Sequence, residues 1–86
     1  MLCSVEISMY PLKGEYKPSI ITFIKNLRQH PLIEVNTNGM STQVFGEYRI
    51  VMNAVNTEIE NTFLKEDSVV FNLKVINSHL EEKPNF

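Results

Sequence analysis

The chain has 86 residues, among them 8 lysines and arginines and 10 aspartates and glutamates, for a formal charge of −2. A chain this short forms one domain and buries only about 60 to 65% of its unfolded surface. Its single core is therefore of modest stability, and self-association would be a natural source of further stability. The near-neutral charge argues against nucleic acid as a partner. No apolar stretch approaches the ~20 residues of a membrane span, and nothing marks export, so we expect a cytoplasmic protein that contacts no membrane.

The first predicted element is a strand over residues 3–10. Apolar and polar side chains alternate along it, as in a strand with one buried face. The apolar set is Val5, Ile7 and Met9, and the polar set is Ser4, Glu6, Ser8 and Tyr10. Cys3 is the one cysteine, and we expect a small buried residue there in preference to a reactive thiol.

A helix is predicted over residues 18–29. Its apolar side chains recur with helical spacing at Ile20, Phe23, Ile24 and Leu27. Pro18 suits the first turn, where its missing N–H costs no hydrogen bond, and Pro31 after His30 predicts the end.

Residues 32–45 predict a β-hairpin that turns at Asn38 and Gly39, a pair that suits the positive φ angles of a two-residue turn. This turn would pair Thr37 with Met40, Asn36 with Ser41 and Val35 with Thr42. The apolar face is then Ile33, Val35, Met40 and Val44, with Thr37 and Thr42 among them, and the other face is Glu34, Asn36, Ser41, Gln43 and Phe45.

The second helix is predicted over residues 48–65 and the last strand over residues 68–76. The expected apolar stripe of the helix is Val51, Met52, Val55, Ile59 and Phe63, with Glu58 and Glu60 on its outer side. In the strand, Val69, Phe71, Leu73 and Val75 share the apolar face. We expect a single domain over residues 1–78 and a polar tail over residues 79–86.

This order of elements predicts the ferredoxin-like α+β fold, βαββαβ, with a four-stranded antiparallel sheet and two helices on one face. The other face would be open and would carry several apolar and aromatic side chains. Its residues are Glu6, Ser8, Tyr10, Asn36, Gln43, Phe45, Val70, Asn72 and Ile76. Either a second copy of the chain or a ligand would explain such a surface.

The sequence offers little for catalysis. His30 falls at a helix end and His79 at the start of the tail, away from any evident nucleophile. The glycines are isolated, which excludes a glycine-rich phosphate loop, and no cluster has the spacing of metal ligands. We therefore expect no catalytic residues, no metal and no cofactor, and keep a small hydrolase as a remote alternative.

Two segments carry a resemblance to a known family. Residues 6–12 read EISMYPL and residues 40–46 read MSTQVFG. In these motifs, and in the order and length of its elements, the chain resembles the YkoF-like thiamine-binding family. The resemblance implies non-catalytic binding of thiamine or of its hydroxymethylpyrimidine part, and assembly into dimers or tetramers through the sheets.

An aminopyrimidine has a flat apolar face and a hydrogen-bonding edge, so it favours an aromatic ring with Asn, Ser or Thr groups. The candidate ligand-binding residues are Glu6, Ser8, Tyr10, Asn36, Thr37, Thr42 and Phe45. The cationic thiazolium would favour a carboxylate or an aromatic face, for which Glu6, Glu34 and Tyr10 are the candidates. Alternation places Thr37 and Thr42 on the opposite face from the others, so one pocket could hold all of them only at the end of the sheet or at a bulge. The alternative is a homo-oligomeric regulatory or scaffold domain without a ligand.

Overall fold

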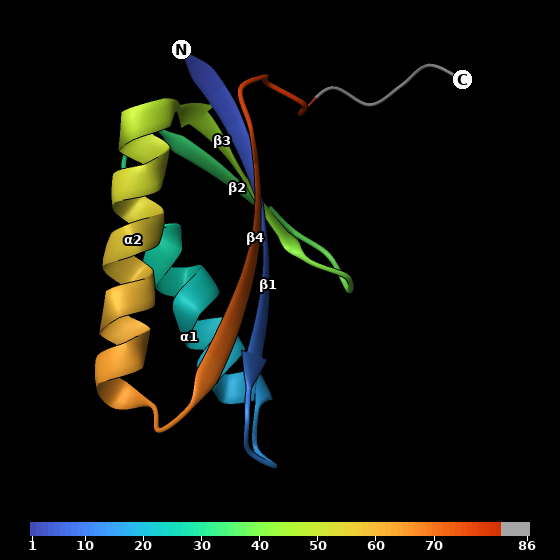
Figure 1. Ribbon diagram of the computed structural model, residues 1–86, viewed down its shortest axis with the longest axis vertical. Coiled ribbons are helices and arrows are strands. Elements are labelled where there is room, and N and C mark those ends of the chain that lie inside the picture. The colour runs from blue at the N-terminus through green and yellow to red at the C-terminus, as the bar shows by residue number, and fades with distance from the viewer. Residues whose placement is uncertain (82–86) are drawn as a thin grey trace.

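The computed structural model describes residues 1–81, which form four strands and two helices in the predicted order. They are β1 (Leu2–Pro11), α1 (Lys17–Leu27), β2 (Ile33–Thr37), β3 (Thr42–Glu47), α2 (Tyr48–Lys65) and β4 (Val69–Ile76). The strands make an antiparallel sheet in the order β2-β3-β1-β4, and both helices cover one face of it (Figure 1). This is the ferredoxin-like α+β fold, as predicted. Residues 82–86 of the predicted tail lie outside the described residues.

The core lies between the sheet and the helices, where the apolar faces of both meet. Its fully buried members include Cys3 and Val5 of β1, Val44 of β3, Leu27 of α1 and Val51 of α2. Burial raises the pKa of the Cys3 thiol, with a smaller contribution from the nearby Glu47 carboxylate. The prediction that Cys3 is a buried residue is thus confirmed. Neither helix within residues 1–81 is long and apolar enough to cross a membrane.

Helix α1 ends two residues earlier than predicted. Beyond Leu27 the N–H groups of Gln29 and His30 donate to the carbonyls of Asn26 and Leu27, three residues back. Such bonds tighten the final turn and satisfy carbonyls that the helix leaves free. The apolar spacing continues to Leu27 and no further, which is where the helix stops.

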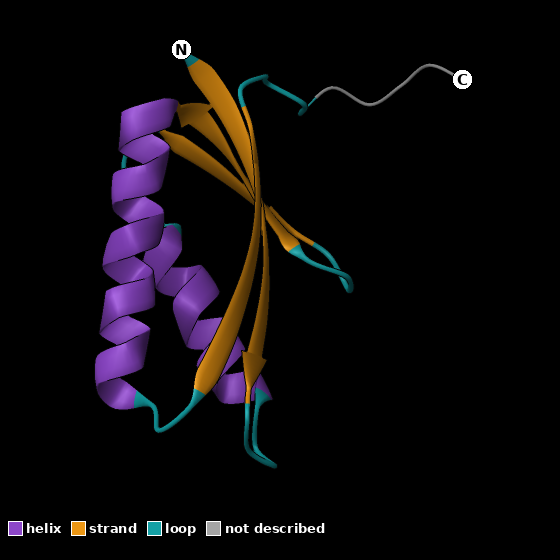
Figure 2. Cartoon of the chain, viewed as in Figure 1, coloured by secondary structure: helices purple, strands orange, loops and turns teal. Residues whose placement is uncertain are grey.

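The hairpin register differs from the prediction by two residues. Thr37 pairs with Thr42, and Val35 pairs with Val44, so residues 38–41 form a four-residue loop (Figure 2). The Asn38 side-chain oxygen accepts hydrogen bonds from the N–H groups of Met40 and Ser41, at 2.8 and 3.1 Å. Asn38 therefore organises the loop through its side chain, and neither Asn38 nor Gly39 adopts the positive φ that the predicted turn requires.

A shift of two residues leaves every side chain on its predicted face, because the side-chain period of a strand is two. Met40 is the exception, since it now belongs to the loop and not to a strand. Its side chain is 89% exposed, so its predicted place in the core is wrong.

The buried stripe of α2 is rotated relative to the prediction. Val51 and Val55 are buried as expected, but Ala54 and Glu58 complete the stripe, and Phe63 is more than half exposed. Glu58 is only 6% exposed and its Oε2 lies 2.6 Å from Nε2 of His30. The prediction that Glu58 lies on the outer side is therefore wrong. A hydrogen-bonding partner lowers the cost of burying a carboxylate, so Glu58 can occupy a position in the buried stripe where an apolar residue would be expected.

The sheet face without helices is covered in part by residues 78–81. The Ser4 hydroxyl donates to the Ser78 carbonyl at 2.7 Å and accepts from the Leu80 N–H at 2.8 Å. The His79 ring packs on Phe45 with centroids 5.5 Å apart. Phe45 therefore lies on its predicted face but is only 5% exposed, instead of open to solvent.

Candidate functional site

A pocket forms where β1 extends past the end of β3. The pairing of these strands stops at Ile7 and Thr42, whereas on its other side β1 pairs with β4 as far as Pro11. The β2–β3 loop turns away from the sheet at this point (Figure 1). Within residues 1–81, the edge of β1 over residues 8–11 thus has no strand beside it, and its backbone polar groups on that side can bind something else.

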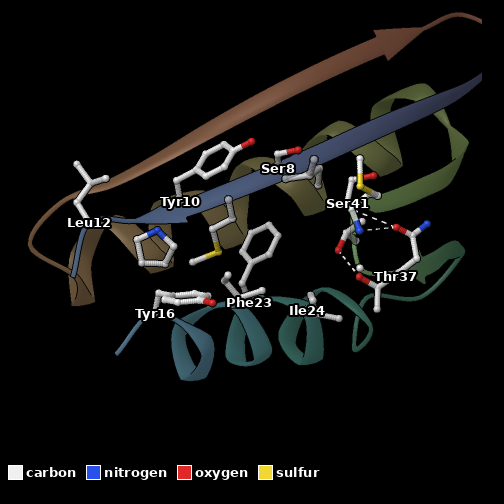
Figure 3. Close-up of a pocket in the computed structure, with 16 residues that line it drawn as sticks. Ser8, Tyr10, Leu12, Tyr16, Phe23, Ile24, Thr37 and Ser41 are labelled. Carbon is white, nitrogen blue, oxygen red and sulfur yellow. Dashed lines mark hydrogen bonds between the residues drawn. The ribbon is translucent and has the colours of Figure 1, made fainter. Parts of the chain in front are cut away.

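Helix α1 closes the pocket below this edge. Phe23 and Ile24 face β1 from the helix, and Tyr16 lies beside them just before the helix begins (Figure 3). The pocket has a volume of about 550 Å³, within the range typical of small-molecule sites. Its walls are Ile7, Ser8, Met9, Tyr10, Pro11, Leu12, Tyr16, Ile20, Phe23, Ile24 and residues 37–42.

The polar groups of the pocket gather at the hairpin. The hydroxyls of Thr37 and Thr42 lie 2.6 Å apart, and Asn38 and Ser41 follow in the loop. None of the lining residues within the described chain carries a charge. An apolar, aromatic wall with hydroxyl and amide groups at one end suits a flat, uncharged molecule with a hydrogen-bonding edge.

The structure brings four of the predicted ligand-binding residues to this pocket. Thr37 and Thr42 lie at its hairpin end, and Ser8 and Tyr10 contribute from β1. The side chains of Ser8 and Tyr10 lie on the opposite side of β1 from Phe23 (Figure 3), as strand alternation requires. Ser8 and Tyr10 line the same pocket as the threonines because β1 continues past the first residue of β3, Thr42, and its edge is uncovered there.

The other three predicted residues lie elsewhere. Glu6 and Phe45 border a second hollow of about 700 Å³ on the sheet face without helices, with Lys74, Ile76 and Leu80. Asn36 is exposed on the outer strand β2, opposite Gln43, and lines neither space.

Several lining residues were missed by the sequence reasoning, chiefly Leu12, Tyr16, Met40 and the apolar residues of α1. The helical spacing of Ile20, Phe23 and Ile24 gives no sign of a pocket, because an apolar helical stripe looks the same whether it packs on a sheet or borders a cavity. Leu12 and Met40 do fall in the two segments that carry the family resemblance, residues 6–12 and 40–46, whereas for Tyr16 the sequence offers only an aromatic residue next to a turn.

No three His, Cys, Asp or Glu side chains within residues 1–81 are grouped in a way that could hold a metal ion. His30 and Glu58 form a close pair beside the end of α1, and Asn61 donates to the other oxygen of Glu58 at 3.3 Å. This pair lies apart from the pocket under β1.

No protein-family model matches the chain, and no curated protein is significantly similar to it in sequence. Solved structures with the same fold include a hypothetical protein from Methanocaldococcus jannascii, with a TM-score of 0.78 and 23% identity over 98% of this chain and 88% of that one. A "putative thiamine biosynthesis/salvage protein" from Thermotoga maritima has a TM-score of 0.78 and 16% identity over 91% of this chain and 85% of that one. A domain of unknown function, DUF77, from Bacillus cereus has a TM-score of 0.69 and 14% identity over 93% of this chain and 79% of that one. At these identities the likeness establishes the ferredoxin-like fold.

Proposed function

We propose that the pocket between β1, α1 and the β2–β3 loop binds thiamine or its hydroxymethylpyrimidine part without chemical turnover, in a cytoplasmic member of the YkoF-like family. The observation that carries the proposal is the pocket itself, which combines aromatic walls with a free strand edge and uncharged polar groups. Two side observations support it. The name of the Thermotoga maritima protein refers to thiamine, and the two segments that resemble the family meet at this pocket.

The two segments that resemble the family, residues 6–12 and 40–46, come together at the pocket. Residues 7–12 of the first segment and residues 40–42 of the second all line the pocket, although they lie far apart in the sequence. The fold brings them together because the chain leaves β1, forms α1 and returns through the hairpin beside the same end of β1. A common ligand is the simplest reason for both segments to resemble one family.

Among the described residues no charged side chain lines the pocket, and this suggests which form of the ligand binds best. A neutral pyrimidine needs no counter-charge, and the cationic thiazolium can lie against an aromatic ring such as that of Tyr16. A diphosphate would have to bury negative charge without a lysine or arginine beside it, which is costly. We expect hydroxymethylpyrimidine and thiamine to bind, and thiamine diphosphate to bind at least about tenfold more weakly, a difference of about 1.4 kcal/mol.

Calorimetric titration of the purified chain with these three compounds tests the proposal. Tyr16→Ala should weaken thiamine binding by roughly tenfold, because stacking of a base on an aromatic side chain contributes about 1–3 kcal/mol. Tyr48→Ala is the matched control, since Tyr48 is also an exposed tyrosine but begins α2 and does not line the pocket. No heat and no thermal shift with millimolar thiamine and hydroxymethylpyrimidine would reject the proposal.

A second candidate function is self-association through the sheet, with or without a ligand. Strand β4 is an edge of the sheet, and apolar side chains on both of its faces are exposed, with Val75 at 47% on one face and Val70 at 48% on the other. It contains no proline, and Lys74 is its one charged residue. Isolated edge strands usually avoid this composition because it invites pairing with another strand.

Antiparallel pairing of two β4 strands about Leu73 would be self-complementary. Leu73 would face its own copy, Phe71 would face Val75, Val70 would face Ile76 and Lys74 would face Asn72. Apolar residues then meet apolar residues and the two lysines stay apart. Val75→Lys should convert a dimer into a monomer in sedimentation or light scattering, whereas an unmodified chain that is strictly monomeric would reject this candidate.

A further inference from the structure

The β2–β3 loop forms one wall of the pocket but has few connections to the rest of the molecule. Within residues 1–81, the hydrogen bonds of residues 38–41 stay inside the hairpin with one exception. The exception is the Ser41 hydroxyl, which donates to Oε2 of Glu6 at 2.9 Å. This bond crosses from the loop to the central strand β1.

Glu6 is well placed to hold the loop. It lies opposite Gln43 of β3 and opposite Lys74 of β4, so its carboxylate is in the middle of the sheet face without helices. Its second oxygen lies 3.4 Å from the Lys74 ammonium. The hydrogen bond from Ser41, followed by the hydrogen bond and the charge of Lys74, lowers the pKa of Glu6, so the carboxylate is ionised at neutral pH and is a strong acceptor.

We infer that Glu6 is a positioning residue for the pocket, which acts by holding Ser41 and does not itself touch the ligand. The inference rests on the proposed function, because the pocket is the site in question. Glu6 borders the hollow on the other side of the sheet and does not line the pocket, whereas Ser41 does. Holding Ser41 keeps its neighbour Met40 in the wall, although the Met40 side chain has little other support.

Backbone ¹⁵N relaxation of the ligand-free protein tests the first half of the inference. Order parameters of residues 39–41 should be close to about 0.85 in the unmodified chain and should fall toward about 0.6 in Ser41→Ala and in Glu6→Ala. Glu6→Gln, whose side-chain oxygen can still accept the bond, should keep most of the order. Lys74→Ala is the control, because it removes the other partner of Glu6 and leaves the Ser41 bond intact.

Titration with thiamine and with hydroxymethylpyrimidine tests the second half. Ser41→Ala and Glu6→Ala should each weaken binding by roughly tenfold, and the double variant should be no weaker than either single variant, since both changes remove one interaction. Loss of affinity in the Lys74→Ala control, or an ordered loop in Ser41→Ala, would overturn the inference. So would a loop that loosens while affinity is unchanged.

The two experiments separate this inference from the proposed function. If the unmodified chain binds neither compound, the proposed function fails, and a positioning role for that ligand fails with it. The relaxation data then still decide whether Glu6 orders the loop. If the unmodified chain binds and only the variants behave otherwise than expected, the inference fails alone.

Discussion

The carboxylate of Glu58 is buried beside the end of α1, and each of its oxygens has a partner. Oε2 lies 2.6 Å from the His30 ring, and Oε1 accepts from Asn61 at 3.3 Å. A carboxylate is buried at low cost only with such partners. The pair also connects the segment after α1 to the middle of α2.

Replacing His30 by alanine should lower the free energy of unfolding by about 2 kcal/mol, because a hydrogen bond to a charged group contributes about 1.5–3 kcal/mol. Urea denaturation followed by circular dichroism measures the change. Gln29→Ala, at the exposed preceding position, is the control and should stay within about 0.5 kcal/mol of the unmodified chain. Equal stability of the two variants would show that the pair contributes nothing.

At the scale of elements, Gly46 lets β3 end against the segment that precedes β2. Its φ is +155°, and an added Cβ would lie 3.1 Å from the Leu32 carbonyl oxygen and 3.1 Å from a Val51 methyl group. One of these contacts is with backbone and the other is with the core of α2, so neither neighbour can move easily.

Gly46→Ala should therefore destabilise the protein by about 2 kcal/mol, by backbone strain and crowding together. Gly39→Ala is an informative counterpart, because Gly39 has no positive φ and nothing within 4 Å of an added Cβ. Gly39→Ala should be neutral or should stabilise the protein by about 0.4–1 kcal/mol, because alanine lowers the conformational entropy of the unfolded chain. Strong destabilisation by Gly39→Ala would indicate the two-residue Asn-Gly turn after all. Thermal and urea unfolding measure both variants.

At the scale of the whole molecule, Glu66 joins three parts of the fold. It follows the end of α2, its Oε2 lies 2.7 Å from the Lys13 ammonium of the β1–α1 loop, and its other oxygen accepts from Ser19 of α1. The hydrogen bond from Lys13 and then that from Ser19 lower the pKa of Glu66. The folded state therefore binds the proton less tightly than the unfolded chain does.

Stability from Glu66 should be present above the ordinary glutamate pKa of about 4.3 and should be lost as the pH falls through the lower pKa of the folded state. The lowered pKa values of Glu6, Glu47 and Glu81 act in the same direction, while the pKa of Glu34, raised by the neighbouring Glu81 carboxyl group, acts in the opposite one. The melting temperature should fall between about pH 6 and about pH 3. In Glu66→Gln this fall should be smaller, and an identical fall would exclude a contribution from Glu66.

Periodicity in the sequence was enough to predict the order of the elements and the faces of the strands. Val5, Val44 and Val51 are buried on the faces that were predicted. These faces are predictable because the periods of strands and helices are local properties of the chain. Even the wrong hairpin register kept the faces correct, since an error of two residues preserves the alternation. The turn itself was mispredicted because the Asn38 side chain competes with the backbone geometry that an Asn-Gly pair favours.

What only the tertiary structure decided is which residues meet. Thr37 and Ser8 can border one pocket because β1 is longer than β3 and continues past it. Where the two strands stop pairing is set by tertiary contacts and not by the local sequence pattern. Glu58 is buried because His30 comes to it from another element, and Phe45 is covered because residues 78–81 return over the sheet. The sequence by itself determined the βαββαβ fold and its core face, through local periods. The pocket depends on contacts between distant segments, and these have no local signal.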